Sequence, residues 1–258
     1  MYGAIIGDLA GSIYEYEQIK EIKSINIDCL IQSNSFYSDD TILTIALLDA
    51  IMNSCNYDEY LKKYINQYKE YRPNFKPYFK SSFSPGLIKW SESNGTGFSH
   101  GNGAMMRISP IGYMFDDEQD VIENARLATI PSHNSEEAIN AATTIALIIH
   151  YLRKGINKEK IFNKLDLKIC YLPFTKFNTT CEETLNNCLY AFYHSNSFED
   201  SIRKTIAMGG DTDTNACIVG SMAEALYGID DNLIDEVNRR IPKDFVKVLK
   251  KSRYRNNL

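Results

Sequence analysis

The chain has 258 residues, which is enough to bury a substantial hydrophobic core. Its 28 basic and 33 acidic residues give a formal net charge of −5 at pH 7, and they form no long basic run. Nucleic-acid binders depend on attraction between basic side chains and phosphates, so this balance argues against duplex DNA or RNA as the main partner. A hydrophobic content of 44%, with 17 Tyr and 12 Phe, argues against disorder.

No segment predicts membrane insertion or export. The longest strongly apolar stretch, residues 138–152, is shorter than the roughly 20 residues that a bilayer span requires. Near the N-terminus, Asp8 interrupts the chain before a signal sequence can develop, and no basic residue precedes it. The six cysteines show no C-x-x-C spacing, which is typical of reduced, mostly buried thiols. We therefore expect a cytoplasmic protein with no membrane partner, and we expect a monomer.

Helical periodicity dominates the chain. The pattern predicts helices near residues 2–14, 40–54, 57–71, 84–92, 103–109, 117–129, 135–154, 157–164, 179–195, 198–208, 213–227 and 243–252. Alternating apolar residues at 25–29 and 165–169 are compatible with short strands, but neither stretch is long enough to found a sheet. The sequence predicts an all-α fold, organised as a single compact orthogonal helical domain over residues 1–258.

Two of these helices, near 135–154 and 213–227, are apolar on all sides rather than along one stripe. Such helices belong at the centre of a large helical core. Gly220 lies inside the second one, where it costs about 1 kcal/mol of helix propensity relative to Ala. We therefore expect another helix to approach Gly220 closely.

Two acidic motifs open apolar helices: Ser38-Asp39-Asp40-Thr41 and, much later, Gly209-Gly210-Asp211-Thr212-Asp213-Thr214. Taken alone, each is compatible with ordinary helix capping, because hydroxyls and acids suit helix starts. One acid suffices for a cap, however, while each motif carries two carboxylates and a hydroxyl. If the two helix starts converge, four like charges meet, which raises their pKa values or demands a cation. An oxygen-only ligand set suits Mg²⁺, Mn²⁺ or Ca²⁺ better than Zn²⁺, so the motifs predict a binuclear metal site at helix N-termini.

Five segments in order along the chain carry a more specific signal. They are Gly7-Asp8-Leu9-Ala10-Gly11-Ser12-Ile13-Tyr14-Glu15, Ser38-Asp39-Asp40-Thr41, the stretch from Ser99 to Gly112 with Gly101-Asn102-Gly103 and Met106-Arg107, His133 before an Ala-rich helix, and Gly210-Asp211-Thr212-Asp213-Thr214. Together they resemble, from end to end, the ADP-ribosylglycohydrolase family, which includes the activating glycohydrolase of dinitrogenase reductase and the ADP-ribosyl-acceptor hydrolases. Ser38 departs from the commoner Thr of the family motif but keeps the hydroxyl.

This resemblance implies an all-α fold around two divalent cations, Mg²⁺ or Mn²⁺ depending on the member. By position it implies that the cations are bound by Ser38, Asp39, Asp40, Asp211, Asp213 and Thr214. Relatives cleave the glycosidic bond between the distal ribose of ADP-ribose and an acceptor, so the implied substrate is an ADP-ribosylated protein or small molecule. The cations would orient the ribose diol, lower the pKa of a bound water and stabilise developing charge.

The resemblance also suggests which side chains handle protons and substrate. Glu15 matches a glutamate that reaches the metal site in some relatives and changes place with substrate, although a helix-end acid is more often merely solvated. Asp40 is the other candidate for handling the water. ADP-ribose contacts are implied for Ser99, Gly101, Asn102, Gly103 and His133. Residues 95–103 form a glycine-rich stretch, for which an ordinary turn is the alternative.

Two other functions remain compatible with these residues. A catalytically silent ADP-ribose binder or structural relative would keep the fold without turnover, but all six implied ligand positions retain an oxygen-bearing side chain, which favours an enzyme. A metal-dependent phosphohydrolase would use similar carboxylates. The Gly101-Asn102-Gly103 segment and Glu15 favour the glycohydrolase over it through the resemblance alone.

Overall fold

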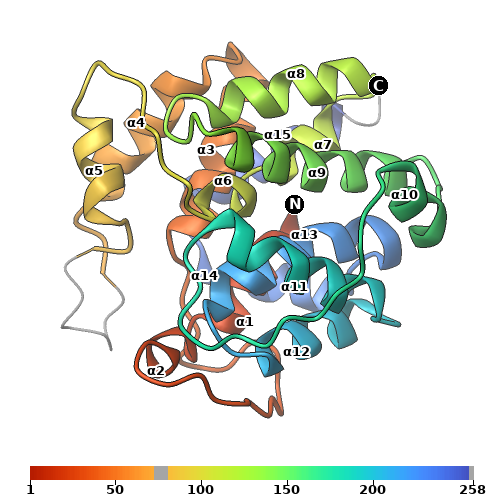
Figure 1. Ribbon diagram of the computed structural model, residues 1–258. Helices are drawn as coiled ribbons and strands as arrows, with labels where there is room; N and C mark the ends of the chain where they lie inside the picture. The colour runs from red at the N-terminus through yellow and green to blue at the C-terminus, as the bar shows by residue number, and fades with distance from the viewer. Residues whose placement is uncertain (73–80, 256–258) are drawn as a thin grey trace.

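The computed structural model describes residues 1–72 and 81–255, with side chains described as far as Ser252, and all its regular elements are helices (Figure 1). In chain order they are α1 Tyr2–Gly11, α2 Glu15–Gln18, α3 Asp39–Asn53, α4 Tyr57–Tyr68, α5 Pro85–Ser91, α6 Gly103–Met106, α7 Ser109–Met114, α8 Glu118–Thr129, α9 Glu136–Arg153, α10 Lys158–Lys164, α11 Cys181–Tyr193, α12 Phe198–Ala207, α13 Thr212–Tyr227, α14 Asp231–Arg240 and α15 Lys243–Arg255. The all-α prediction is confirmed. The predicted extent of 1–258 also includes residues 73–80 and 256–258, which lie outside the described residues.

The centre of the fold is the pair α1 and α13, which come from opposite ends of the chain and pack against each other (Figure 1). Every residue of α1 is buried. A Cβ built on Gly7 would lie 2.0 Å from the carbonyl oxygen of Ala216, and one on Gly220 would lie 2.2 Å from that of Gly3. The two backbones are therefore in direct contact, and the predicted close approach at Gly220 is confirmed.

The other predicted all-apolar helix, α9, also lies in the core and packs against α13, α8 and α7. Around this centre, α11 and α12 cover one flank of α13, and α3 joins α1 and α13 to α4 and α15. Of the elements that meet at the centre, α3 and α13 are the two whose starts carry the acidic motifs of the sequence.

The prediction of short strands was wrong: the described residues form no strand, and residues 25–29 and 165–169 are irregular. Their polar backbone groups find other partners. Arg203 of α12 donates to the carbonyl oxygens of Ile27 and Asp28, and Leu167 N–H donates to Phe162 O in the turn that ends α10. Extended segments whose hydrogen bonds are satisfied this way have no need of a partner strand.

Helix boundaries also differ from the sequence pattern. α1 ends at Gly11 rather than near residue 14, because the Ser12 hydroxyl donates to Leu9 O and accepts from the Phe36 N–H, which turns the chain there. The pattern missed α2, α7 and α14. In α14 the core-facing side is short, with only Val237 buried, so the apolar periodicity is weak.

No helix in the described part of the chain combines the length and apolarity that a bilayer crossing requires. All six cysteines are free, as expected. The expectation that most are buried was wrong, since Cys29, Cys55 and Cys170 are exposed.

Candidate functional site

The two acidic motifs converge, as the sequence predicts. Carboxylate oxygens of Asp8, Asp40 and Asp213 lie within 4.8 Å of one another, and so do those of Glu15, Asp211 and Asp213. Asp213 is common to both groups. We call these five residues the carboxylate cluster.

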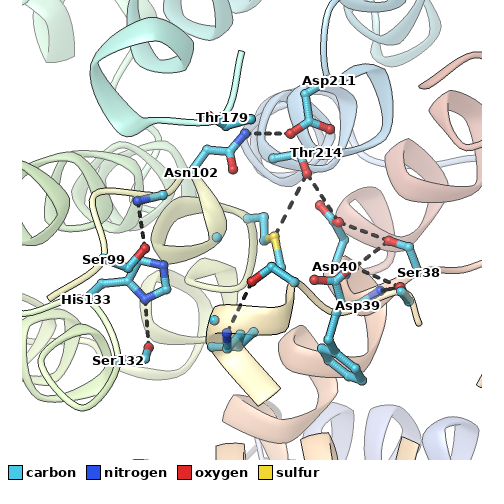
Figure 2. Close-up of a pocket in the computed structure, with 18 of the residues that line it drawn as sticks. Ser38, Asp39, Asp40, Ser99, Asn102, Ser132, His133, Thr179, Asp211 and Thr214 are labelled. Carbon is cyan, nitrogen blue, oxygen red and sulfur yellow. Dashed lines mark hydrogen bonds between the residues drawn. The ribbon is translucent and has the colours of Figure 1, made fainter. Parts of the chain in front are cut away.

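Hydroxyls from both motifs surround Asp40 (Figure 2). Ser38 caps α3, because its Oγ accepts the Asp40 backbone N–H, and the same Oγ–H donates to Asp40 Oδ2 over 3.0 Å. Thr214 at the start of α13 donates to Asp40 Oδ2 from the other side over 3.3 Å. The start of α3 is thus tied to the start of α13 by polar side chains.

Asp211 does not behave as an ordinary cap. It occupies the N-cap position of α13, yet its side chain makes no capping hydrogen bond. Instead, Asp211 Oδ2 accepts from Asn102 Nδ2 over 2.7 Å (Figure 2). The backbone N–H of Asp211 donates to Asn178 Oδ1. Helix capping alone therefore does not explain this acid.

Asp39 is brought to the same place but belongs to neither group of carboxylates. Its Oδ1 accepts from the Ser82 hydroxyl over 2.9 Å, and its own N–H donates back to Ser82 Oγ over 2.6 Å. Ser82, which precedes α5, was not anticipated from the sequence.

Burial gives the cluster unusual electrostatics. Desolvation, followed by the charge of Asp213, raises the pKa of Asp8 from its ordinary 3.8 to about 7. Burial likewise raises the pKa of Asp39 to about 7. For Asp40, Asp211 and Glu15, burial is again the largest cause, the charge of Asp213 is the next, and each pKa lies well above its ordinary value. Without a cation, these acids resist joint ionisation.

The residues present fit a divalent cation. Asp8 Oδ1 and Asp40 Oδ1 are buried and have no hydrogen-bond partner among the described residues. A buried carboxylate oxygen left unpaired costs free energy, and a hard cation supplies the missing partner. The donors around this point are carboxylates and hydroxyls, which are the ligands that Mg²⁺ and Mn²⁺ prefer.

Asp8 is the functional candidate that the sequence analysis did not place in the site. Its Oδ2 accepts three hydrogen bonds from α3: the Ser38 N–H at 2.9 Å, the Thr41 N–H at 3.1 Å and the Thr41 hydroxyl at 2.5 Å. Asp8 lies near the end of α1, so no helix-start pattern marks it. The available signal was an acid in an otherwise apolar, fully buried helix, since such acids are rarely buried without a partner.

A pocket of about 790 Å³ opens beside the cluster. One wall holds the acids with Ser38 and Thr214, and the facing wall holds Ser99, Gly101, Asn102, Gly103 and His133. All the residues predicted to bind cations or substrate line this one pocket, apart from the added Asp8, which lies beneath it. Exposed apolar side chains of Ile19 and Phe98 also line the pocket.

The glycine-rich stretch is held at both ends rather than being a free turn. Gly97 O accepts from the Asn134 N–H, and the Asn102 N–H donates to Thr179 O, both over 2.9 Å. The Gly101 N–H is used within the stretch, where it donates to Ser99 Oγ over 3.0 Å. This N–H is therefore less available to a ligand than the sequence pattern suggested.

Glu15 begins the short helix α2, is half-buried and lines the pocket next to Asp211 and Asp213. Of the two interpretations of Glu15, the purely solvated helix-end acid is wrong. His150, in contrast, lies away from this pocket in α9 and interacts with Phe115 O.

Comparison with known proteins agrees with this geometry. The model of the family described as ADP-ribosylglycohydrolase matches residues 1–257. The ADP-ribosylhydrolase ARH3 of Homo sapiens is 24% identical, over 88% of this chain and 84% of the relative. The ADP-ribosylarginine hydrolase Tri1 of Pseudomonas putida (strain GB-1) is 22% identical, over 89% of this chain and 70% of the relative. A solved structure, titled ADP-ribosylglycohydrolase-related protein complex, shares the fold with a TM-score of 0.66 at 19% identity, covering 98% of this chain and 93% of that chain.

Proposed function

Because the chain belongs to the ADP-ribosylglycohydrolase family, we propose that it is a divalent-cation-dependent hydrolase that releases ADP-ribose from a modified protein side chain, nucleobase or small molecule. The observation that carries the proposal is that the carboxylate cluster, with its unpaired buried oxygens, meets one pocket: all its members except Asp8 line the pocket, together with the glycine-rich stretch. Relatives named as hydrolases of ADP-ribosylated substrates support the reaction class.

The proposed cation ligands are Ser38, Asp39, Asp40, Asp211, Asp213 and Thr214, to which we add Asp8. Two ions, Mg²⁺ or Mn²⁺, would neutralise the acids, orient the ribose diol and make a bound water more acidic. Asp213 belongs to both groups of close carboxylates, which supports its role as a cation ligand.

Side chains of the protein would then transfer protons and bind the rest of the substrate. Asp40 would receive the proton of the attacking water, because it lines the pocket and burial holds its pKa well above the ordinary value. Glu15 is the second proton-handling group, at the edge of the pocket. In the facing wall, Ser99, Gly101, Asn102, Gly103 and His133 bind the rest of ADP-ribose. We also propose that residues 1–258 act as one domain, as a cytoplasmic monomer.

A substrate panel tests this proposal. Peptides with ADP-ribose on Arg or Ser, and ADP-ribosylated nucleic acid, are incubated with the protein in Mg²⁺, in Mn²⁺ and in EDTA, and the products are separated by chromatography. We expect free ADP-ribose from at least one substrate with metal and none in EDTA. Metal-independent release would contradict the cation assignment. Release of AMP would indicate a phosphohydrolase, and binding of ADP-ribose without release from any substrate would indicate a silent binder.

A further inference from the structure

A fully buried arginine lies behind the pocket wall that faces the carboxylate cluster. Arg107 follows α6 directly and has no accessible surface. No carboxylate among the described residues forms an ion pair with it, and its Nε and Nη1 have no hydrogen-bond partner there. A buried cation without a directly paired carboxylate is costly, so its retention calls for a reason beyond packing.

Within the described residues, the side-chain hydrogen bonds of this guanidinium lead toward the pocket. Arg107 Nη2 donates to Ser132 Oγ over 2.6 Å, and Ser132 Oγ lies 2.7 Å from His133 Nδ1 (Figure 2 shows the second contact). Arg107 Nη2 itself is 3.5 Å from His133 Nδ1. Ser132 and His133 both line the pocket, whereas Arg107 does not.

The direction of these hydrogen bonds follows from chemistry. Arginine has no acceptor, so Ser132 Oγ must accept from Arg107. The Ser132 hydroxyl proton is then free, and within the described residues the only acceptor within reach of Ser132 Oγ is His133 Nδ1. Nδ1 therefore accepts, and a neutral imidazole ring must carry its proton on Nε2.

The proton on Nε2 faces the substrate side. A Cβ built on Gly101 or Gly103 would lie 3.4 or 3.5 Å from His133 Nε2, so this nitrogen points at the glycine-rich stretch. Among the described residues Nε2 has no hydrogen-bond partner. The charged groups that face the ring are Arg107 and His100, the latter paired with Glu137 over 3.0 Å. Burial and then the Arg107 charge hold the pKa of His133 well below 6.5, so the ring stays neutral.

We infer that Arg107 and Ser132 are positioning residues that lock His133 as the neutral Nε2–H tautomer, aimed over Gly101 and Gly103 to donate to a diphosphate oxygen of the ligand. This inference rests on the proposed function for the identity of the ligand. The buried positive charge of Arg107 also favours an anion at this wall, although it never touches the ligand itself.

Histidine-selective ¹⁵N NMR of the metal-free, unliganded protein tests the tautomer without any reference to activity. His133 is assigned by comparison with His133→Gln. We expect a protonated Nε2 and an unprotonated Nδ1 throughout pH 5.5–8. In Ser132→Ala we expect a mixture of tautomers, and in Arg107→Gln we expect His133 to titrate at higher pH than in the wild type. A wild-type ring that carries its proton on Nδ1, or that titrates near pH 6.5, overturns the inference.

Calorimetry with ADP-ribose and Mg²⁺ tests the consequence for binding. Ser132→Ala should weaken ADP-ribose binding by about tenfold, the value of one hydrogen bond to a charged group, and leave Mn²⁺ affinity unchanged. The matched control is Ser201→Ala, which removes a buried hydroxyl that bonds only to its own helix in α12. Equal ADP-ribose affinity in Ser132→Ala and Ser201→Ala would refute the positioning role. If the wild type keeps the Nε2–H tautomer but binds no ADP-ribose, the proposed function fails, while the positioning of His133 by Arg107 and Ser132 stands.

Discussion

Asn102 and Asp211 are 109 positions apart in the chain, and Asn102 Nδ2 donates a hydrogen bond to Asp211 Oδ2 over 2.7 Å. This contact joins the glycine-rich stretch to the carboxylate cluster, so the two walls of the pocket are not independent. A change in the charge of the carboxylate cluster therefore acts directly on Asn102, which is proposed to bind substrate.

The first prediction concerns this contact. Asn102→Ala leaves a buried oxygen of Asp211 without its donor, and Asn102→Asp places a second acid beside it. We expect kcat/KM to fall by tenfold or more in the alanine variant, since hydrogen bonds to charged groups contribute about 1.5–3 kcal/mol. The kcat/KM of the aspartate variant should fall further, because the new carboxylate repels both Asp211 and the diphosphate of the substrate. Steady-state kinetics at saturating Mg²⁺ measure both, and wild-type kinetics in Asn102→Asp would contradict the coupling.

Asp213→Ala should abolish metal binding and turnover while keeping the helical fold. Asp213 is the residue common to both groups of close carboxylates. Removing it also relieves repulsion, so we expect the melting temperature in EDTA to equal or exceed that of the wild type. Mn²⁺ calorimetry, circular dichroism and thermal unfolding provide the three readouts. Asp235→Ala, on the exposed side of α14, is the matched control and should behave as wild type.

The substitution Asp8→Asn distinguishes the roles of the two carboxylate oxygens of Asp8. All three hydrogen bonds from α3 end on Oδ2, while Oδ1 is buried and unpaired. An asparagine can keep its carbonyl oxygen at the Oδ2 position, but it then places an NH₂ group at the Oδ1 position, where a cation ligand is proposed. We expect unchanged or higher stability in EDTA, together with at least tenfold weaker Mn²⁺ binding. Asp8→Ala should lose stability as well, because it removes the acceptor. Undiminished Mn²⁺ affinity in Asp8→Asn would exclude Asp8 as a ligand.

The metal-free protein should lose stability as the pH rises from about 5 to 7.5. In the folded state burial raises the pKa of Asp8 and of Asp39 to about 7, whereas the unfolded chain ionises near 3.8. Between these values the folded state binds more protons than the unfolded state, so the free energy of unfolding falls with increasing pH. The lowered pKa of His133 contributes with the opposite sign, but it is outweighed by the carboxyl groups whose pKa values are raised. Thermal unfolding in EDTA should show the decline, and saturating Mn²⁺ should suppress it. A melting temperature that rises with pH in EDTA would contradict this prediction.

Gly7→Ala should destabilise the protein severely. The added Cβ would lie 2.0 Å from the carbonyl oxygen of Ala216, and neither backbone can yield without separating α1 from α13. We expect a loss above about 3 kcal/mol, at or beyond the upper end for overpacked cores. Gly86→Ala is the control, because nothing lies within 4 Å of the corresponding Cβ. Urea denaturation of the two variants provides the comparison.

Much of the fold and site was predictable because local chemistry and tertiary structure agree. The all-apolar character of α9 and α13 indicated their central position, and Gly220 indicated a backbone contact. The two acidic motifs were predictable as a pair because a buried helix start with surplus carboxylates has few explanations other than a cation.

Other features depend on contacts that no local pattern records. Asp8 lies within α1, where nothing in the sequence shows that α3 will begin beside it. Ser82 contacts Asp39 across 43 residues, and Arg107 reaches Ser132 across 25. The irregular stretch at 25–29 has strand-like alternation, but side chains of α12 satisfy its carbonyl groups.

The pairing of α1 with α13 has a consequence for how the chain is made. During synthesis from the N-terminus, α1 emerges about two hundred residues before its partner, because α1 spans Tyr2–Gly11 and α13 spans Thr212–Tyr227. The face of α1 that α13 covers in the folded protein therefore lacks its partner for most of translation. The carboxylate cluster, which needs both helices, assembles only when nearly all of the chain has left the ribosome.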